Sequence, residues 1–297
     1  MPIAHQLSPH EKDLGGGFKV RRLLPAAQQR SVGPFIFFDH FGPVTEEPGA
    51  NHDVRPHPHI GLATVTYLFD GAMMHRDSIG SEQRIEPGAI NWMTSGRGIV
   101  HSERKPDDLR GKRFVNHGLQ LWTALPRANE EDAPSFEHTP ASAIPEVQVG
   151  AAQVRVLIGD AFGKSSPVKV YSQTVYLDVR LPAGGEIAIP ALAGQLAVYA
   201  VEGDIAVDGQ ALPAFMMGVL ESGAASVSST HGARFVVVGG EALDGPRHMW
   251  WNFVSSRKER IIQASDDWEA QRMGQVPGEN EFIPLPPTRF TPPEPLS

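Results

Sequence analysis

Cysteine is absent from the 297 residues of this chain. Its absence excludes disulfide bonds, thiolate catalysis and every zinc or iron–sulfur site with cysteine ligands. A bound metal ion would therefore have to be held by histidine, aspartate or glutamate.

Long hydrophobic runs are also lacking, since no stretch approaches the roughly 20 apolar residues that a membrane helix needs. The N-terminal sequence MPIAHQLSPHEKDLGGG has neither an apolar core nor a basic start, so it does not resemble a secretory signal. These features predict a soluble, cytoplasmic protein with no membrane partner.

Positive charge is in deficit, with a net charge of -8 and a pI near 5.8. A general nucleic-acid surface requires clustered lysine and arginine that displace counterions from phosphates. We therefore expect no direct nucleic-acid partner. The short basic groups are interpreted as solvated faces: Lys19, Arg21 and Arg22, and Arg257, Lys258 and Arg260.

Glycine and proline are abundant, at 30 and 26 residues, and they separate short apolar runs throughout the chain. This punctuation is typical of an all-β fold. Residues 126–146 are rich in proline, alanine and acidic residues, which predicts a linker. The expected domains are an N-terminal barrel at 1–126, a linker at 127–146 and a C-terminal barrel at 147–297. One helix is expected in SDDWEAQRMG, capped by Ser265, followed by an extended proline-rich tail at 284–297.

The two halves of the chain share a short pattern. At a constant offset of 132 residues, Tyr67 aligns with Tyr199, Asp70 with Glu202 and Gly71 with Gly203. The recurrence indicates a duplicated barrel. The same offset places His57 on Ile189, so the second half lacks imidazoles where the first has two.

The motif RPHPHIG carries the strongest chemical signal. Residues two apart lie on one face of a strand, so His57 and His59 can converge on one metal ion, although an isolated pair of this kind is often a surface feature. His101 and Glu103 repeat the spacing about forty residues later. Three imidazoles and one carboxylate suit a divalent transition metal such as Fe(II).

The remaining histidines receive weaker interpretations. His52 and His75 flank the first motif and could orient the metal ligands, although a surface role is as well supported. His40 is expected to be a turn residue. His117 is interpreted as structural. Among the histidines interpreted in this way, it is the first candidate for a functional role. Trp92 and Met93 are expected in the core.

Five motifs occur in an order and spacing that resemble the pirin family of the cupin superfamily: FIFFDHFGP, HPHIGLATVTYLFDG, HRDSIGS, PGAINWMTSGRGIVHSE and LQLWTALP. The resemblance implies a bicupin, in which two antiparallel β-barrels pack face to face. It also implies one iron in the N-terminal barrel, held by His57, His59, His101 and Glu103, and none in the C-terminal barrel.

Two residues differ from the usual sequence of the family motif. Pirins commonly read HPHRGFE where this chain reads HPHIGLA, so Ile60 replaces an arginine and Ala63 a glutamate. Because Ala63 cannot ligate a metal, Glu103 remains the carboxylate of the set. We expect the loss of this charged pair to make the metal cavity more apolar and to change substrate preference.

The resemblance implies two functions of different classes. The first is an iron-dependent dioxygenase of the quercetin 2,3-dioxygenase type, with a small aromatic substrate, dioxygen and Glu103 as the catalytic base. The second is a non-catalytic regulator whose iron oxidation state controls binding to a protein partner, either a transcription factor or a metabolic enzyme. Zinc, nickel or manganese in place of iron remains an alternative.

Overall fold

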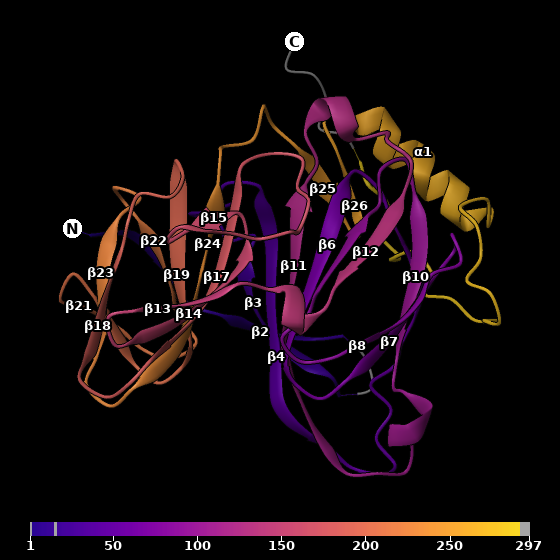
Figure 1. Cartoon of the computed structure of the whole chain (residues 1–297). Coiled ribbons are helices and arrows are strands. Elements are labelled where there is room, and N and C mark those ends of the chain that lie inside the picture. The colour runs from indigo at the N-terminus through magenta and orange to yellow at the C-terminus, as the bar shows by residue number, and fades with distance from the viewer. Residues whose placement is uncertain (1, 15–16, 292–297) are drawn as a thin grey trace.

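Two similar halves of antiparallel strands make up the computed structural model, which describes residues 2–14 and 17–291 (Figure 1). Each half pairs a seven-stranded sheet with a four-stranded sheet. The predicted all-β bicupin architecture, with one short C-terminal helix, is confirmed. Small-sheet strands such as β18 alternate between buried and exposed residues, whereas the central strands of the large sheets, such as β6 and β19, are buried on both faces.

The first half, called here the N-terminal barrel, consists of one large and one small antiparallel sheet. Its large sheet runs β12 (Ser135–Thr139), β9 (Ile90–Thr94), β6 (Leu62–Asp70), β11 (Phe114–Ala124), β4 (Phe35–Glu46), β3 (Lys19–Leu24) and β2 (His10–Asp13). Its small sheet runs β5 (Val54–His59), β10 (Ile99–Arg104), β7 (Met73–Asp77) and β8 (Glu82–Ile85).

The second half, called the C-terminal barrel, repeats this plan. Its large sheet runs β1 (Ile3–Leu7), β22 (Met217–Leu220), β19 (Gln195–Glu202), β24 (Ala233–Gly240), β17 (Thr174–Leu181), β14 (Ala152–Ile158) and β13 (Glu146–Val149). Its small sheet runs β18 (Gly185–Ile189), β23 (Ala225–Ser229), β20 (Ile205–Val207) and β21 (Gln210–Leu212). The strand-by-strand match confirms the duplication inferred from Tyr67 and Tyr199, which lie on the equivalent strands β6 and β19.

Short elements complete the described chain. They are the hairpins β15 (Asp160–Ala161) with β16 (Lys164–Ser165) and β25 (His248–Trp250) with β26 (Phe253–Ser255), the 3-10 turns η1 (Asp107–Leu109), η2 (Arg127–Asn129) and η3 (Ala141–Ala143), and the helix α1 (Lys258–Glu269). Among the described residues, no helix combines the length and apolar character needed to cross a membrane.

Each barrel takes an edge strand from outside its predicted residue range. The first strand of the chain, β1, pairs with β22 of the C-terminal barrel, and β12 pairs with β9 of the N-terminal barrel. The segment 127–146 therefore contains a sheet strand, because residues 135–139 find backbone partners that its proline-rich composition did not reveal. The domain boundaries at 126 and 146 stay predictions: β12 lies between them, and β1 precedes both although it pairs with the C-terminal barrel.

A shared core joins the large sheets of the two barrels. It contains Tyr67 and Leu119 from one side and Tyr199 and Val236 from the other, all fully buried. Each tyrosine hydroxyl reaches the opposite barrel: Tyr67 donates to Asp178 at 2.7 Å, and Tyr199 lies 2.7 Å from Nδ1 of His40. The two barrels are thus tied by buried hydrogen bonds as well as by apolar packing.

His40 is not the turn residue that the sequence suggested. It lies in the middle of β4, fully buried, with Nε2 2.8 Å from Nε2 of His117. Burial lowers the pKa of both rings, that of His117 to about 4, so the pair is neutral. Its main partner, Tyr199, lies 159 residues away, which local sequence cannot indicate.

The predicted helix exists but begins earlier than expected. It starts at Lys258, and Ser265 lies inside it, donating its hydroxyl proton to the carbonyl of Ile261 instead of capping the N-terminus. Ile261, Ala264, Ser265 and Trp268 form its buried face at helical spacing. The helix packs on the N-terminal barrel near Ile60 (Figure 1). Residues 284–291 of the predicted tail form no helix or strand, and 292–297 lie outside the described residues.

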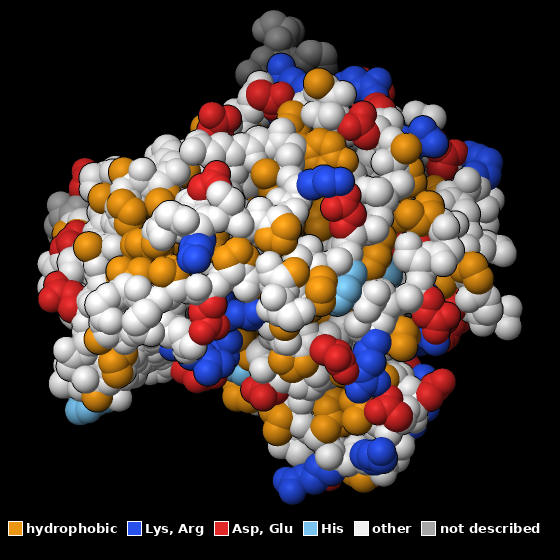
Figure 2. Space-filling view, viewed as in Figure 1, with side chains coloured by type: hydrophobic (Ala, Val, Ile, Leu, Met, Phe, Trp, Pro, Cys, Tyr) orange, Lys and Arg blue, Asp and Glu red, His pale blue; other side chains and the backbone are white. Residues whose placement is uncertain are grey.

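Charged side chains of both signs are intermixed over the face shown in Figure 2. Of the basic residues expected to be solvated, Lys19 is exposed and pairs with Glu11, and Arg257 pairs with Glu131. Arg22 differs, because its side chain is only 19% exposed and pairs with the buried Asp39. Arg260 differs too, because its side chain is only 11% exposed and pairs with Glu131. The interpretation of Arg22 and Arg260 as parts of solvated faces is therefore wrong.

Candidate metal centre

The small sheet of the N-terminal barrel carries the histidine motif. His57 and His59 lie on β5, where His57 is directly opposite His101 on β10. Pro58 between them has no amide proton to donate, which suits β5 as an edge strand of its sheet. Gly61 then turns the chain at a φ of +67°, where a Cβ would meet the carbonyl oxygen of Val254 at 2.0 Å.

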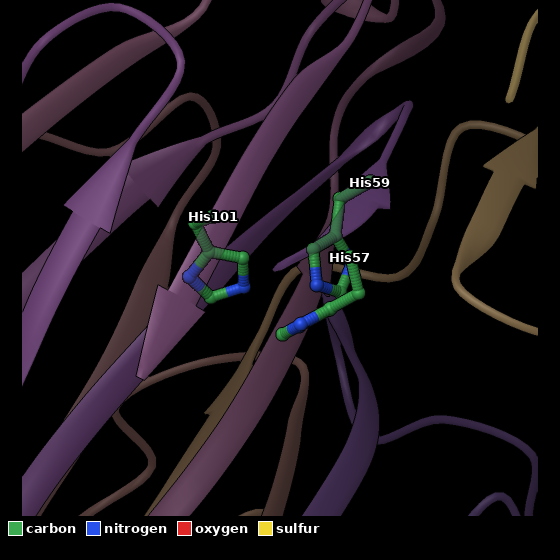
Figure 3. A group of neighbouring side chains, drawn as sticks. All are labelled: His57, His59 and His101. Atoms are coloured by element: carbon green, nitrogen blue, oxygen red, sulfur yellow. The ribbon is translucent and has the colours of Figure 1, made fainter. Parts of the chain in front are cut away.

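The three imidazoles form a compact group. The ring centroids are separated by 4.3 Å for His57 and His101, 5.0 Å for His57 and His59, and 5.1 Å for His59 and His101. One nitrogen from each ring lies within 4.8 Å of the others, and the rings face one another in Figure 3. All three side chains are buried. This grouping of three nitrogens is compatible with binding one metal ion.

Hydrogen bonds on the outer side orient two of these rings. Nδ1 of His57 donates to the carbonyl of Arg55 at 2.9 Å, which leaves the lone pair of Nε2 free to bind a metal ion. Nδ1 of His101 lies 3.3 Å from Nδ1 of His75, whose Nε2 lies 2.9 Å from a carboxylate oxygen of Asp77. Nε2 of His75 donates to the carboxylate of Asp77, so Nδ1 of His75 can accept a hydrogen bond from Nδ1 of His101. This chain fixes the tautomer of His101 and directs the lone pair of its Nε2 toward the other two rings.

Burial keeps the three rings uncharged. It lowers the pKa of His57 to about 4 and lowers the pKa values of His59 and His101 well below the usual range. Nδ1 of His59 and Nε2 of His101 are buried without a hydrogen-bond partner in the described part of the chain. Neutral, unpartnered nitrogens are expensive to bury, and a divalent cation would satisfy them.

Glu103 stands slightly apart from the histidines. It follows His101 on β10 and lines the same cavity, but its carboxylate is not among the atoms within 4.8 Å of one another. The pairing of β10 with β5 shifts register between His101 and Glu103, opposite Val54. Burial raises the pKa of Glu103 to about 7, which is the expected state of a desolvated carboxyl with no cation beside it.

The flanking histidines have different positions. His75 is buried against His101, as described above. His52 instead pairs with Glu46 at 2.6 Å and stacks on Phe18, with ring centroids 5.2 Å apart. Trp92 and Met93 are buried, as expected for core residues.

A cavity of about 460 Å³ opens beside the triad. One wall is aromatic, since the rings of Phe37 and Trp122 stack with centroids 3.9 Å apart and Trp122 meets His59 edge to face. Arg22, Asp39 and Gln120 also line it. These three residues were not predicted from the sequence, although Asp39 within the apolar run FIFFDHF was a signal, because an acid in a core strand needs a buried partner.

Ile60 and Ala63 do not line this cavity. Ile60 points away from His59 and packs against helix α1, and Ala63 lies in the core shared by the two barrels. Strand alternation explains both positions, since neighbours in sequence face opposite sides of a sheet. The expectation that these two residues make the metal cavity more apolar is therefore wrong.

Comparison with known proteins agrees with this geometry. A family model described as Pirin matches residues 17–123, and one described as the Pirin C-terminal cupin domain matches residues 176–274. The chain belongs to the pirin family. A pirin-like protein from Caulobacter vibrioides is 46% identical over 281 residues, covering 93% of this chain and 96% of that protein, and mouse pirin is 32% identical over 89% of this chain and 91% of its own length.

Solved structures show the same fold for this pirin. A crystal structure titled quercetin 2,3-dioxygenase from Acinetobacter baumannii superimposes with a TM-score of 0.90 at 33% identity, covering 97% of both chains. A more distant pirin from Escherichia coli, solved in complex with nickel(II), has a TM-score of 0.64 at 17% identity over 80% of this chain and 99% of its own, and supports the fold alone.

Proposed function

We propose that this pirin is an iron-dependent dioxygenase of the quercetin 2,3-dioxygenase type, acting on a flavonol or a similar enolisable aromatic compound. The observation that supports it best is the neutral His57, His59 and His101 triad beside a cavity of about 460 Å³ that Phe37 and Trp122 also line. Cavities of this size and character suit small aromatic ligands.

The metal proposed is one Fe(II) per chain, held by the three histidines and Glu103. Three neutral nitrogens and one carboxylate suit a divalent transition metal, but this donor set does not select iron by affinity. Zinc, nickel and manganese are the alternatives that metal analysis would detect. Bound iron would supply a Lewis acid and a one-electron centre for dioxygen chemistry.

The protein side chains would prepare the substrate. Phe37 and Trp122, which line the cavity, would provide aromatic contacts for an aromatic compound beside the triad. Glu103 would accept the proton of the enolic hydroxyl group, since a base must lie within reach of the proton that it removes and Glu103 lines the same cavity. Apolar walls such as Phe41 and Met73 would keep water from the reacting atoms.

The role of Glu103 is testable by substitution. Glu103→Ala should abolish flavonol turnover and sharply weaken iron binding, whereas Glu103→Gln should separate the lost base from the lost side-chain volume. Oxygen uptake and iron content are measured for each, with the exposed Glu82→Gln as the matched control. Full activity with stoichiometric iron in Glu103→Ala would contradict the assignment. Negligible ring cleavage, with protein capture that changes on iron oxidation, would support the regulatory alternative.

A further inference from the structure

A row of polar side chains crosses the large sheet of the N-terminal barrel. Thr66, Gln120, Asp39 and Arg22 are direct neighbours in register across β6, β11, β4 and β3. Gln120, Asp39 and Arg22 line the cavity beside the triad. We call these four residues the polar row.

The polar row is held rigidly by its own contacts. Thr66 donates to the amide oxygen of Gln120 at 2.8 Å. Nε and Nη2 of Arg22 donate to the two carboxylate oxygens of Asp39, each at 2.7 Å, and the guanidinium lies 4.2 Å above the ring of Phe37. A planar, bidentate pair of this kind has a fixed direction and loses little entropy when a ligand arrives.

The fold does not require polar groups at these positions. The residues in the equivalent register of the C-terminal barrel are Val198, Val237, Leu177 and Val156. All four are fully buried in the apolar core of that barrel. Since a buried ion pair adds little or nothing to stability compared with apolar packing, stability does not account for Arg22 and Asp39.

Hydrogen-bonding capacity remains free in the row. Among the described residues, Nε2 of Gln120 and Nη1 of Arg22 donate to no protein acceptor, while each oxygen of Asp39 accepts one bond and has a further lone pair. Gln120 and Asp39 lie two residues along their strands from Trp122 and Phe37, which is about 7 Å. A ligand spanning the aromatic wall from the triad would reach them.

We propose that the polar row is a substrate-orienting subsite, which binds a ring hydroxyl group on the part of an aromatic substrate that does not contact the metal. The hydroxyl donates to Asp39 and accepts from Gln120 or Arg22. This inference rests on the proposed function for the class of ligand. It adds the requirement that the substrate carries a hydroxyl group beyond the one placed at the metal.

The test compares two kinds of ligand on protein loaded with Zn(II) under argon, where binding is measured without turnover. The ligands are 3-hydroxyflavone and its analogues with one added ring hydroxyl group, followed by fluorescence titration. The wild type should bind at least one hydroxylated analogue about fivefold more tightly, the equivalent of one net hydrogen bond. Gln120→Met and Arg22→Lys should bring this ratio near one, whereas Lys12→Met at the pocket mouth should retain it.

The possible results test the proposed subsite and the proposed reaction independently. A wild-type ratio near one for every analogue, or an unchanged ratio in both folded variants, would overturn the subsite. Thermal unfolding shows whether each variant is folded, and the wild-type series decides the question even if a variant is not. Retained preference without oxygen consumption by the iron-loaded enzyme would overturn the proposed reaction and leave the subsite standing.

Discussion

The two barrels share a strand order but differ in what fills them. In the C-terminal barrel the interior is closed by aliphatic side chains, including Ile187 and Ile189 on β18. In the N-terminal barrel the equivalent small-sheet strand β5 carries His57 and His59, and a cavity of about 460 Å³ replaces the packed core. One copy of a duplicated fold can thus supply stability while the other accepts the cost of buried polar groups.

The pseudo-symmetry extends to the interface between the barrels. Tyr67 bonds Asp178, which pairs with Arg234, whereas Tyr199 bonds His40, which pairs with His117. By strand register Asp178 is the counterpart of His40, and Arg234 of His117. One cluster is thus an ion pair and the other a pair of neutral rings in the same framework.

Removing one buried side chain from each small sheet should produce the largest difference in behaviour between the two barrels. His101→Ala should reduce the bound metal to background, because the remaining nitrogens no longer enclose a cation. Ile189→Ala should keep the metal but lower the free energy of unfolding by about 2–5 kcal/mol through a new cavity. Metal analysis and urea unfolding measure the two effects. Metal retained by His101→Ala would show that the triad is not the site.

A second pair of variants exchanges the character of the two interiors. Leu177→Asn should destabilise the C-terminal barrel by about 3–5 kcal/mol, because it buries an amide without partners. The double variant Arg22→Met with Asp39→Leu replaces a buried ion pair by apolar side chains and should leave stability within about 2 kcal/mol of wild type. Denaturant unfolding of both variants checks the contrast. A large loss in the double variant would mean that the ion pair is structural.

The side chains that orient the metal ligands from behind should have a smaller effect on metal affinity than the ligands themselves. Asp77→Asn should weaken metal binding by about 10- to 100-fold, because Asp77 orients His75 and thereby His101. The matching strand β20 of the C-terminal barrel carries the buried Ile205 and Val207 instead. Competition with a metal chelator measures the affinity, with exposed Asp108→Asn as the control. Equal affinities in Asp77→Asn and wild type would rule out the orienting role.

The interface histidines predict a modest pH dependence. The folded-state pKa of His117 is lowered from 6.5 to about 4, although Asp70 and Glu202 lie 3.8 Å from its Nδ1. The unfolded chain therefore binds protons first, so stability is lost as pH falls below about 6.5. Between pH 7 and 5 the wild type should lose about 2 kcal/mol more than His117→Gln. The exposed Arg113→Gln should keep the wild-type slope; an unchanged slope in His117→Gln would refute the assignment.

Local sequence was sufficient for the features that depend on short-range pattern. The spacing of His57 with His59 selected residues that the fold brings together with His101, and the recurrence of Tyr67 at Tyr199 indicated the duplication. The start of helix α1 was missed because an acidic segment after Ser265 resembled a helix N-terminus, while the buried face began at Ile261.

Features that depend on register between distant strands were not accessible from the sequence. Arg22 meets Asp39 only because β3 pairs with β4, and His40 meets Tyr199 only because two barrels pack together. Ile60 was assigned to the cavity because it replaces an arginine of the family motif, whereas its strand face directs it to helix α1. Cross-strand register, and not residue type, decided each of these cases.

The dioxygenase function is tested most directly by oxygen uptake of the chain purified and loaded with Fe(II) under argon. We expect about one iron per chain, and one dioxygen consumed and one carbon monoxide released for each flavonol lost. The triple variant His57→Ala, His59→Ala and His101→Ala should show neither iron nor uptake. Stoichiometric iron with no oxygen consumption across a panel of flavonols and related enolisable compounds would contradict the dioxygenase function.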